Sequence, residues 1–203
     1  MSTVDLRRFA RAASLAGSAV AVGIWSSDGR GRELDVGTFR AVNRGHGAAA
    51  DRFFRGLTEL GSWWASAAAA AALTASGERR AATRGLAAAS AAWLLGQGAK
   101  RAFLRPRPYD AEPDGARRMI GPPQGTSWPS SHPAVLLAFL TVAGREAGLS
   151  RAARAALTGL AAVVGVSRTY VGVHYPSDVV GGLLLGRAVA DVCSRTPRSG
   201  DRR

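Results

Sequence analysis

Several residue types are scarce in this chain of 203 residues. A single cysteine, Cys193, excludes a disulfide within the chain and any metal site built from several thiolates. Aromatic residues make up only 7% and do not alternate with the basic residues, as a base-stacking surface for nucleic acid requires. β-branched residues are also sparse, whereas Ala and Gly are abundant, so the composition favours closely packed helices over sheets. We therefore expect an all-α protein that does not bind nucleic acid.

Acidic residues are in the minority as well. The chain has 14 Asp and Glu against 27 Lys and Arg, which gives a formal net charge of +13, and Lys100 is the only lysine. The arginines are spread between apolar segments, which favours a membrane surface or an anionic substrate as the partner. The length fits one domain over residues 1–203, with a disordered basic tail at 195–203.

Six apolar stretches alternate with loops rich in Arg, Gly, Asp and Pro, and they predict a six-helix bundle. The stretches cover approximately residues 12–25, 60–76, 85–99, 134–144, 155–166 and 179–190. Several of them have the length of a buried soluble helix, because a membrane span needs about 20 apolar residues. Small-residue faces such as GLAAASAAWLLGQGA nevertheless suit helix packing in lipid. We expect a multi-pass protein of the cell membrane.

The orientation of such a bundle is not decided by counting Arg and Lys, which are balanced between its two sides. The arginines that precede the first stretch favour an N-terminus inside (Arg7, Arg8, Arg11). A secretory signal cleaved after Ala19–Ala21 is an alternative, although the apolar stretch continues to Trp25.

Three polar clusters stand at the ends of the apolar stretches. The first is KRAFLRPRP, Lys100–Pro108, which on its own is typical of a basic patch beside a membrane or of a helix C-cap. The second is WPSSHPAV, Trp128–Val135, where Ser130 or Ser131 caps a helix whose free backbone N–H groups attract anions. Taken alone, these serines are ordinary caps and His132 is a polar interface residue.

The third cluster is SRTYVGVHYPSD, Ser167–Asp178. Pro176 predicts the first position of a helix, which puts Asp178 about one turn beyond His174. The carboxylate then reaches one imidazole nitrogen, fixes the tautomer and makes the other nitrogen a better nucleophile or base. The alternative is a simple helix-start pair with an unrelated arginine.

The three clusters converge if the last four helices alternate in direction. The end of the third stretch, the start of the fourth, the end of the fifth and the start of the sixth then share one face of the bundle. That face gathers one lysine, at least two arginines, two hydroxyls, two histidines and one aspartate. This set is suited to binding a tetrahedral dianion and moving protons around it.

These residues resemble the three-part signature of the type 2 phosphatidic acid phosphatase superfamily, which includes lipid phosphate phosphatases, bacterial acid phosphatases and vanadium haloperoxidases. The matching patterns are K-x6-R-P (Lys100, Arg107, Pro108), P-S-x-H (Pro129, Ser130, His132) and S-R-x5-H-x3-D (Ser167, Arg168, His174, Asp178). They occur in the expected order over residues 100–178. One departure is Ser131, where many relatives carry Gly.

The resemblance implies a metal-independent phosphatase without a cofactor. His174 is then the nucleophile that forms a phosphohistidine, Asp178 holds its other nitrogen, and His132 is the general acid and base. The phosphate-binding groups are then Lys100, Arg107, Ser130, Ser131 and Arg168. The expected substrate is a lipid phosphate such as phosphatidate, phosphatidylglycerophosphate or a polyprenyl phosphate or pyrophosphate.

Other interpretations remain open from the sequence. A soluble or secreted relative would be an acid phosphatase or a vanadate-dependent haloperoxidase, and a non-catalytic bundle would bind anionic lipid headgroups through its basic loops. A zinc site of His132, His174 and Asp178 conflicts with the surrounding arginines. Residues 28–59 contribute nothing to the signature, and we expect them to form a surface amphipathic hairpin over the site with His46 in solvent. The oligomeric state is not indicated by the sequence.

Overall fold

The computed structural model describes residues 3–194, and every regular element within them is helical. The predicted all-α class is therefore confirmed, while the expected basic tail at 195–203 lies outside the described residues. The helices are α1 (Thr3–Trp25), α2 (Gly29–Asn43), α3 (Ala48–Thr58), the 3-10 turn η1 (Glu59–Gly61), α4 (Trp63–Ala75), α5 (Arg79–Ala102), α6 (Pro108–Ala111), α7 (Ser131–Glu146), α8 (Arg151–Tyr170) and α9 (Pro176–Cys193).

The six predicted stretches correspond to the six helices α1, α4, α5, α7, α8 and α9. The predicted number of helices is too low, because α2, α3 and α6 are also helical in the described part of the chain. These three helices are rich in charged and small residues, and α6 has only four residues. Their sequences therefore carry no long apolar stretch by which they would be recognised.

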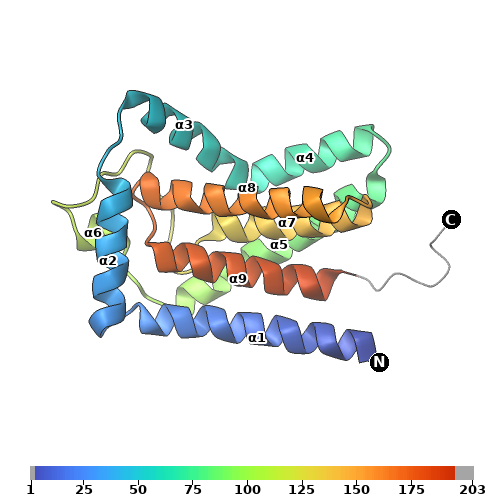
Figure 1. Ribbon diagram of the computed structural model, residues 1–203, viewed down its shortest axis with the longest axis horizontal. Coiled ribbons are helices and arrows are strands. Elements are labelled where there is room, and N and C mark those ends of the chain that lie inside the picture. Colours follow the sequence, from blue (N-terminus) through green and yellow to red (C-terminus); the bar gives the residue numbers. More distant parts are fainter. Residues whose placement is uncertain (1–2, 195–203) are drawn as a thin grey trace.

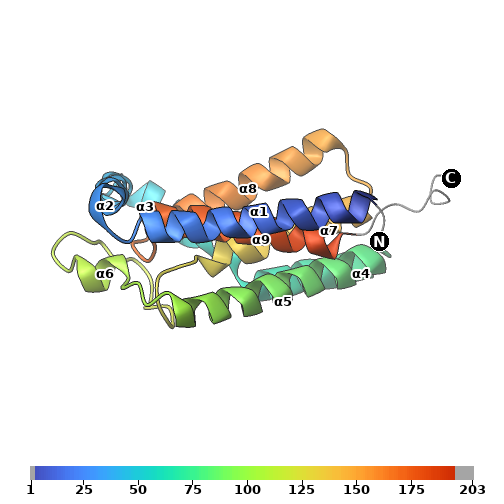
Figure 2. The same ribbon diagram turned by 90° about the horizontal axis from the view of Figure 1, so that it is seen from below.

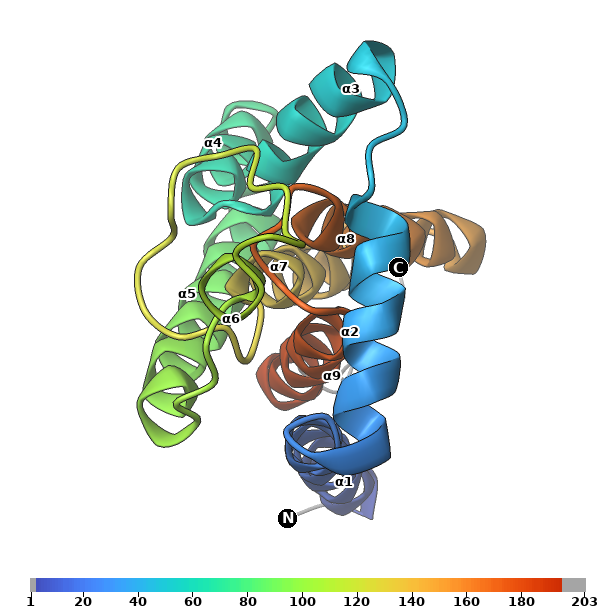
Figure 3. The same cartoon turned by 90° about the vertical axis from the view of Figure 1, so that its left-hand side faces the viewer.

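Helix α7 is the central helix of the bundle. It contacts α4, α5, α8, α9 and η1, and Figure 3 shows it end-on between its neighbours. Its contact with α5 is built from small residues and one aromatic ring, with Phe139 of α7 packed against Ala82 and Ala89 of α5. Small side chains allow the helix backbones to approach closely, as the abundance of Ala predicts.

Helix α1 packs along α9 on the outside of the bundle (Figure 2). Arg11 of α1 binds the carboxylate of Asp191 through two hydrogen bonds, of 2.6 Å from Nε and 2.8 Å from Nη2. Ala19 is buried in the middle of α1, which continues unbroken through the proposed signal cleavage point to Trp25.

Helix α2 lies across one end of the bundle, nearly at right angles to the long helices (Figure 1). Asp35, Phe39 and Asn43 on one side of this helix are buried. Residues 28–59 do not form the expected hairpin, because α2 packs against α8 and α9 whereas α3 packs against α8 and η1. His46, in the connection to α3, is exposed as predicted.

By length and hydropathy, none of the helices within residues 3–194 qualifies alone as a membrane span. Helices α1 and α2 meet the criterion only as a pair, and the chain bends by 90° between them.

Candidate active site

Four helix ends meet at the end of the bundle that α2 crosses (Figure 3). They are the C-terminal ends of α5 and α8 and the N-terminal ends of α7 and α9. This is the convergence that alternating helix directions predict. It places the three sequence clusters side by side, although residues 100 and 178 lie far apart in the chain.

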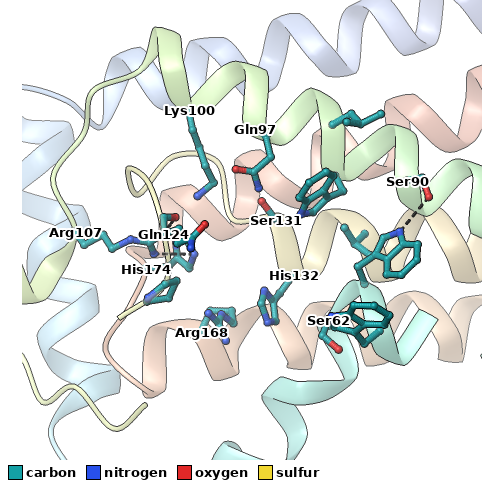
Figure 4. A pocket seen from close by; sticks show the side chains of 17 residues that line it. Ser62, Ser90, Gln97, Lys100, Arg107, Gln124, Ser131, His132, Arg168 and His174 are labelled. Carbon is teal, nitrogen blue, oxygen red and sulfur yellow. Dashed lines mark hydrogen bonds between the residues drawn. The ribbon is translucent and has the colours of Figure 1, made fainter. Parts of the chain in front are cut away.

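A cavity of about 670 Å³ opens at this place. Six of the eight predicted site residues line it, namely Lys100, Arg107, Ser131, His132, Arg168 and His174 (Figure 4). The other two, Ser130 and Asp178, are fully buried and do not line it. Three cationic side chains and two imidazoles therefore face one cavity.

The guanidinium of Arg107 is fixed by backbone carbonyl groups. Its Nε donates to the carbonyl of Gly125 at 2.9 Å, its Nη1 to Val173 at 2.9 Å, and its Nη2 to Gln124 at 3.1 Å. The same Nη1 lies 3.3 Å from His174 Nε2 (Figure 4). Because neutral carbonyl groups hold the arginine, its positive charge is not cancelled by a carboxylate and remains available to an anion.

His174 lies between Arg107 and Asp178. Its Nδ1 is 3.5 Å from Asp178 Oδ2 and has no hydrogen-bond partner within residues 3–194. Burial lowers the pKa of His174 well below its ordinary value, and the nearby cations Lys100, Arg107 and Arg168 lower it further. The imidazole is therefore neutral at pH 7, and one of its two nitrogens carries a free electron pair.

The carboxylate of Asp178 has several further partners. Its Oδ2 accepts hydrogen bonds from the backbone N–H of Tyr175 at 2.8 Å and from the Ser127 hydroxyl at 2.5 Å. Its Oδ1 accepts from Arg105 Nη1 at 2.7 Å. The bond to Tyr175 caps the first turn of α9, so the residue that the sequence predicts beside His174 also starts the helix.

Lys100 and Arg168 approach the cavity from opposite sides. Lys100 Nζ donates to the carbonyl of Thr126 at 2.8 Å. Arg168 Nη1 donates to the Thr58 hydroxyl at 2.7 Å, and its Nε has no partner in the described part of the chain. Both cations are held by neutral oxygens, as Arg107 is, which leaves their charges available to a ligand.

The N-terminal end of α7 supplies two unpartnered hydroxyls. Ser130 is the N-cap residue, but its side chain makes no capping hydrogen bond. The buried Oγ atoms of Ser130 and Ser131 have no partner within residues 3–194, and Ser131 lines the cavity. The hydroxyl of Ser131 is thus available to a bound oxyanion.

The described side chains offer no clear metal site. Within residues 3–194, no three His, Cys, Asp or Glu side chains gather closely enough to hold a metal ion. Both carboxylate oxygens of Asp178 are occupied by protein donors, and His174 Nε2 faces the guanidinium of Arg107. The residues of the zinc alternative therefore do not fit a dication.

The other half of the cavity is apolar and was not predicted from the sequence. Trp63, Trp64, Trp93 and Leu94 line it, from the start of α4 and the middle of α5. Trp63 Nε1 donates to the Ser90 hydroxyl at 3.0 Å, which fixes this indole (Figure 4). Only the folded chain reveals this wall, because the tryptophans belong to none of the three clusters.

Comparison with known proteins gives a family and two similar structures. The model of the PAP2 superfamily matches residues 80–199. Among solved structures, LpxE of Aquifex aeolicus is 26% identical, with a TM-score of 0.71 over 79% of this chain and 94% of that one. The first transmembrane PAP2 type phosphatidylglycerolphosphate phosphatase from Bacillus subtilis is 19% identical, with a TM-score of 0.71 over 90% of this chain and 94% of that one.

The second likeness supports the fold alone, and comparison with curated proteins finds no match. The family match covers more than half of the chain and includes all three sequence clusters. The predicted resemblance is thus confirmed, and the chain belongs to the PAP2 superfamily.

Proposed function

We propose that this PAP2-type phosphatase hydrolyses a lipid phosphate without a metal ion, through a phosphohistidine at His174. One observation carries the proposal: a single cavity of about 670 Å³ has a cationic end with two imidazoles and an apolar wall of three tryptophans. The cationic end suits a phosphate group, and the apolar wall suits the hydrocarbon beside it.

The headgroup chemistry leaves several lipids as candidates. Phosphatidate, phosphatidylglycerophosphate and polyprenyl phosphate or pyrophosphate all join a phosphate dianion to long hydrocarbon chains.

In the first step, Nε2 of His174 attacks the phosphorus atom and the bond from phosphorus to the lipid oxygen breaks. His132 takes up a proton once the phosphate dianion offsets the charges of Lys100, Arg107 and Arg168. It donates this proton to the departing alkoxide, which leaves as a neutral alcohol. Asp178 stabilises the positive charge that develops on the imidazole. Acid catalysis of this kind typically contributes about 10²–10⁴-fold in rate.

In the second step, water replaces the histidine. His132, now neutral, takes a proton from the attacking water, the bond from phosphorus to Nε2 breaks, and inorganic phosphate leaves. His174 returns to its neutral form with its proton on Nδ1. Lys100, Arg107 and Arg168 surround the equatorial oxygens in both steps, where the transition state carries its charge.

The placement in a membrane is part of the proposal. Trp25, at the end of α1 where the chain turns into α2, is 55% exposed. Exposed tryptophans gather at the membrane interface. We place this end at the outer surface of the plasma membrane, so that a lipid headgroup reaches the cationic end of the cavity.

The test is turnover of a panel of lipid phosphates by purified protein in excess chelator. Wild-type protein should release phosphate, His174→Ala should be inactive, and His132→Ala should lose about 10²–10⁴-fold in kcat. Radiolabelled substrate should leave an acid-labile, base-stable label on wild-type protein but not on His174→Ala. Loss of activity in chelator would contradict metal independence, and unchanged turnover in both variants would contradict the mechanism.

The same preparation separates the alternatives. A non-catalytic lipid-binding protein would bind vesicles of anionic lipid without releasing phosphate from any member of the panel. A soluble enzyme would remain in the supernatant of a detergent-free extract. Halide oxidation with vanadate and peroxide would indicate a haloperoxidase.

A further inference from the structure

A buried carboxylate on α2 lies directly behind the site. Asp35 is 5% exposed, and its Oδ2 accepts a hydrogen bond of 2.6 Å from Arg105 Nη2. The other terminal nitrogen of Arg105 binds Asp178 Oδ1 at 2.7 Å. One guanidinium thus joins the carboxylate beside His174 to a carboxylate from a helix that the family match does not include.

Asp35 also holds the start of α9. Its Oδ1 accepts from the backbone N–H of Ser177 at 2.9 Å, and its Oδ2 accepts from the Ser177 hydroxyl. Ser177 immediately precedes Asp178, so the contact fixes the segment that carries the partner of His174. The guanidinium of Arg105 is fixed further by the ring of Tyr175, whose centroid lies 4.3 Å from Arg105 Cζ.

The net charge of Asp35, Arg105 and Asp178 determines how strongly this network stabilises a positive charge on His174. Asp178 and Arg105 alone form a neutral pair, which stabilises a cationic imidazole only weakly. With Asp35 added, the three groups carry a net charge of −1 in a buried place, where electrostatic interactions are strong. Burial lowers the pKa of Arg105, but the two carboxylates outweigh this effect and raise it above its ordinary value.

We infer that Asp35 is a positioning residue for the reaction: it holds Arg105 and balances its charge, and so leaves Asp178 with the negative charge that the imidazolium of His174 requires. The inference rests on the proposed function, because it assumes that His174 becomes cationic during turnover. Asp35 lies behind Asp178 and does not line the cavity, so it acts through Arg105 and Asp178 and not on the substrate.

The test begins with Asp35→Asn, which removes the charge and keeps the shape. We expect kcat to fall about 10–100-fold, the usual cost of losing a group that orients a functional side chain. KM should change less than about threefold, because the phosphate-binding cations are untouched. Asp28→Asn is the matched control: Asp28 caps the same helix through Gly29 and is exposed, and this variant should keep wild-type kcat.

A double-mutant cycle with Arg105→Met tests the route of the effect. Removal of both Asp35 and Arg105 charges restores the charge balance, so the double variant should recover at least about tenfold of the kcat lost in Asp35→Asn. The double variant also serves as the test if Asp35→Asn does not fold. It leaves no buried guanidinium that lacks one of its two carboxylate partners. Additive losses in the two variants would overturn the inference.

Ser177→Ala separates charge from hydrogen bonding. It removes the hydrogen bond that the hydroxyl donates to Asp35 and the one that it accepts from Arg105 Nη1 at 2.6 Å. Every charge stays in place, so we expect the variant to keep at least about a third of kcat. A loss as large as that of Asp35→Asn would contradict the charge argument. If His174→Ala is inactive while Asp35→Asn keeps wild-type kcat, only this inference fails; if His174→Ala is active, the proposed function fails.

Discussion

The ring of His174 lies between the guanidinium of Arg107 and the carboxylate of Asp178, and the guanidinium fixes its tautomer. Arginine has no hydrogen-bond acceptor, so an N–H of Arg107 points its proton at Nε2, which lies 3.3 Å away. Nε2 must therefore carry the electron pair, and Nδ1 carries the proton on the side of Asp178. A bound phosphate would draw the Arg107 N–H to its own oxygens and release Nε2 for attack.

His174 should stay neutral over the pH range in which an ordinary histidine gains its proton. Because its pKa lies well below 6.5, the ring should stay neutral as the pH falls through the ordinary histidine range, and it should gain a proton only at lower pH. The chain has three histidines, so ¹⁵N NMR of histidine-labelled protein can follow each ring, with assignment by single substitution. A midpoint for His174 at or above pH 6.5 would contradict the buried, cation-surrounded environment.

A second prediction concerns Gly61, because His132 packs directly against this residue. A Cβ at position 61 would lie 2.7 Å from His132 Cβ, closer than two carbon atoms approach. Gly61→Ala should therefore displace the proposed general acid, and a displacement of about 1 Å can cost about 10²-fold in kcat.

The control is Gly56→Ala in α3, where a Cβ meets nothing within 4 Å. This variant should keep wild-type kcat and gain slightly in stability, because Ala favours a helix. Phosphate release by the two variants, measured at saturating substrate, checks the comparison. Equal rates would show that the position of His132 tolerates the added methyl group.

The sequence was informative about individual residues where a local pattern carried the information. His174 and Asp178 are one helical turn apart, and the spacing alone predicted their proximity. The partner of Arg105 was not predictable, because Asp35 is 70 residues away and any carboxylate in the chain is an equal candidate from sequence. Thr58, which binds Arg168, escaped prediction for the same reason.

At the scale of elements, α2 joins parts of the chain that are distant in sequence. Asn43, at its C-terminal end, donates to the carbonyl of Tyr170 at 2.7 Å and to that of Arg117 at 3.0 Å. Its side-chain oxygen accepts from the backbone N–H of Arg117 at 2.6 Å. One buried amide thus satisfies three backbone groups of α8 and of the loop before α7.

We expect Asn43→Ala to destabilise the fold by about 1–3 kcal/mol, because it leaves those backbone groups without partners. The measurement is the thermal unfolding transition in detergent, compared with that of Thr38→Ala on the exposed side of the same helix. An unchanged transition temperature for Asn43→Ala would show that water replaces the amide at no cost.

The six long helices were predictable because each contains a run of apolar and small residues. Helix α2 was not, since its buried side is formed by Asp35, Phe39 and Asn43, of which only one is apolar. Hydrophobic periodicity identifies helices that bury apolar faces and misses those that bury polar ones. The convergence of helix ends was predictable once antiparallel packing was assumed, but the cavity wall contributed by α4 was not.

For the molecule as a whole, helix length and helix hydropathy disagree on whether the bundle spans a membrane. Helix α5 has 24 residues, which corresponds to about 36 Å, longer than a hydrocarbon core of about 30 Å. Its Arg, Lys, Gln and Gly residues keep it from passing a hydropathy test. Leu95, which does not line the cavity, is nevertheless 54% exposed on this helix.

The proposed orientation makes a prediction that distinguishes the two ends of the bundle. Leu104, in the loop after α5, lies at the site end and is 78% exposed, whereas Arg151 is exposed at the start of α8, at the other end. Each position is changed to Cys in a Cys193→Ser background, which leaves one thiol per molecule. In intact cells, a membrane-impermeant maleimide should label Leu104→Cys, and it should label Arg151→Cys only after lysis.

The two thiols control for each other, because both lie on exposed surfaces and differ only in the end of the bundle that they mark. The reverse pattern would place the site on the cytoplasmic side, where the three arginines before residue 12 would then have to be translocated, against the usual distribution of basic residues. Labelling of neither thiol before lysis would indicate that the bundle does not cross the membrane. In that case the apolar wall of the cavity has to receive lipid drawn from a bilayer surface, and the exposed tryptophans become the contact with it.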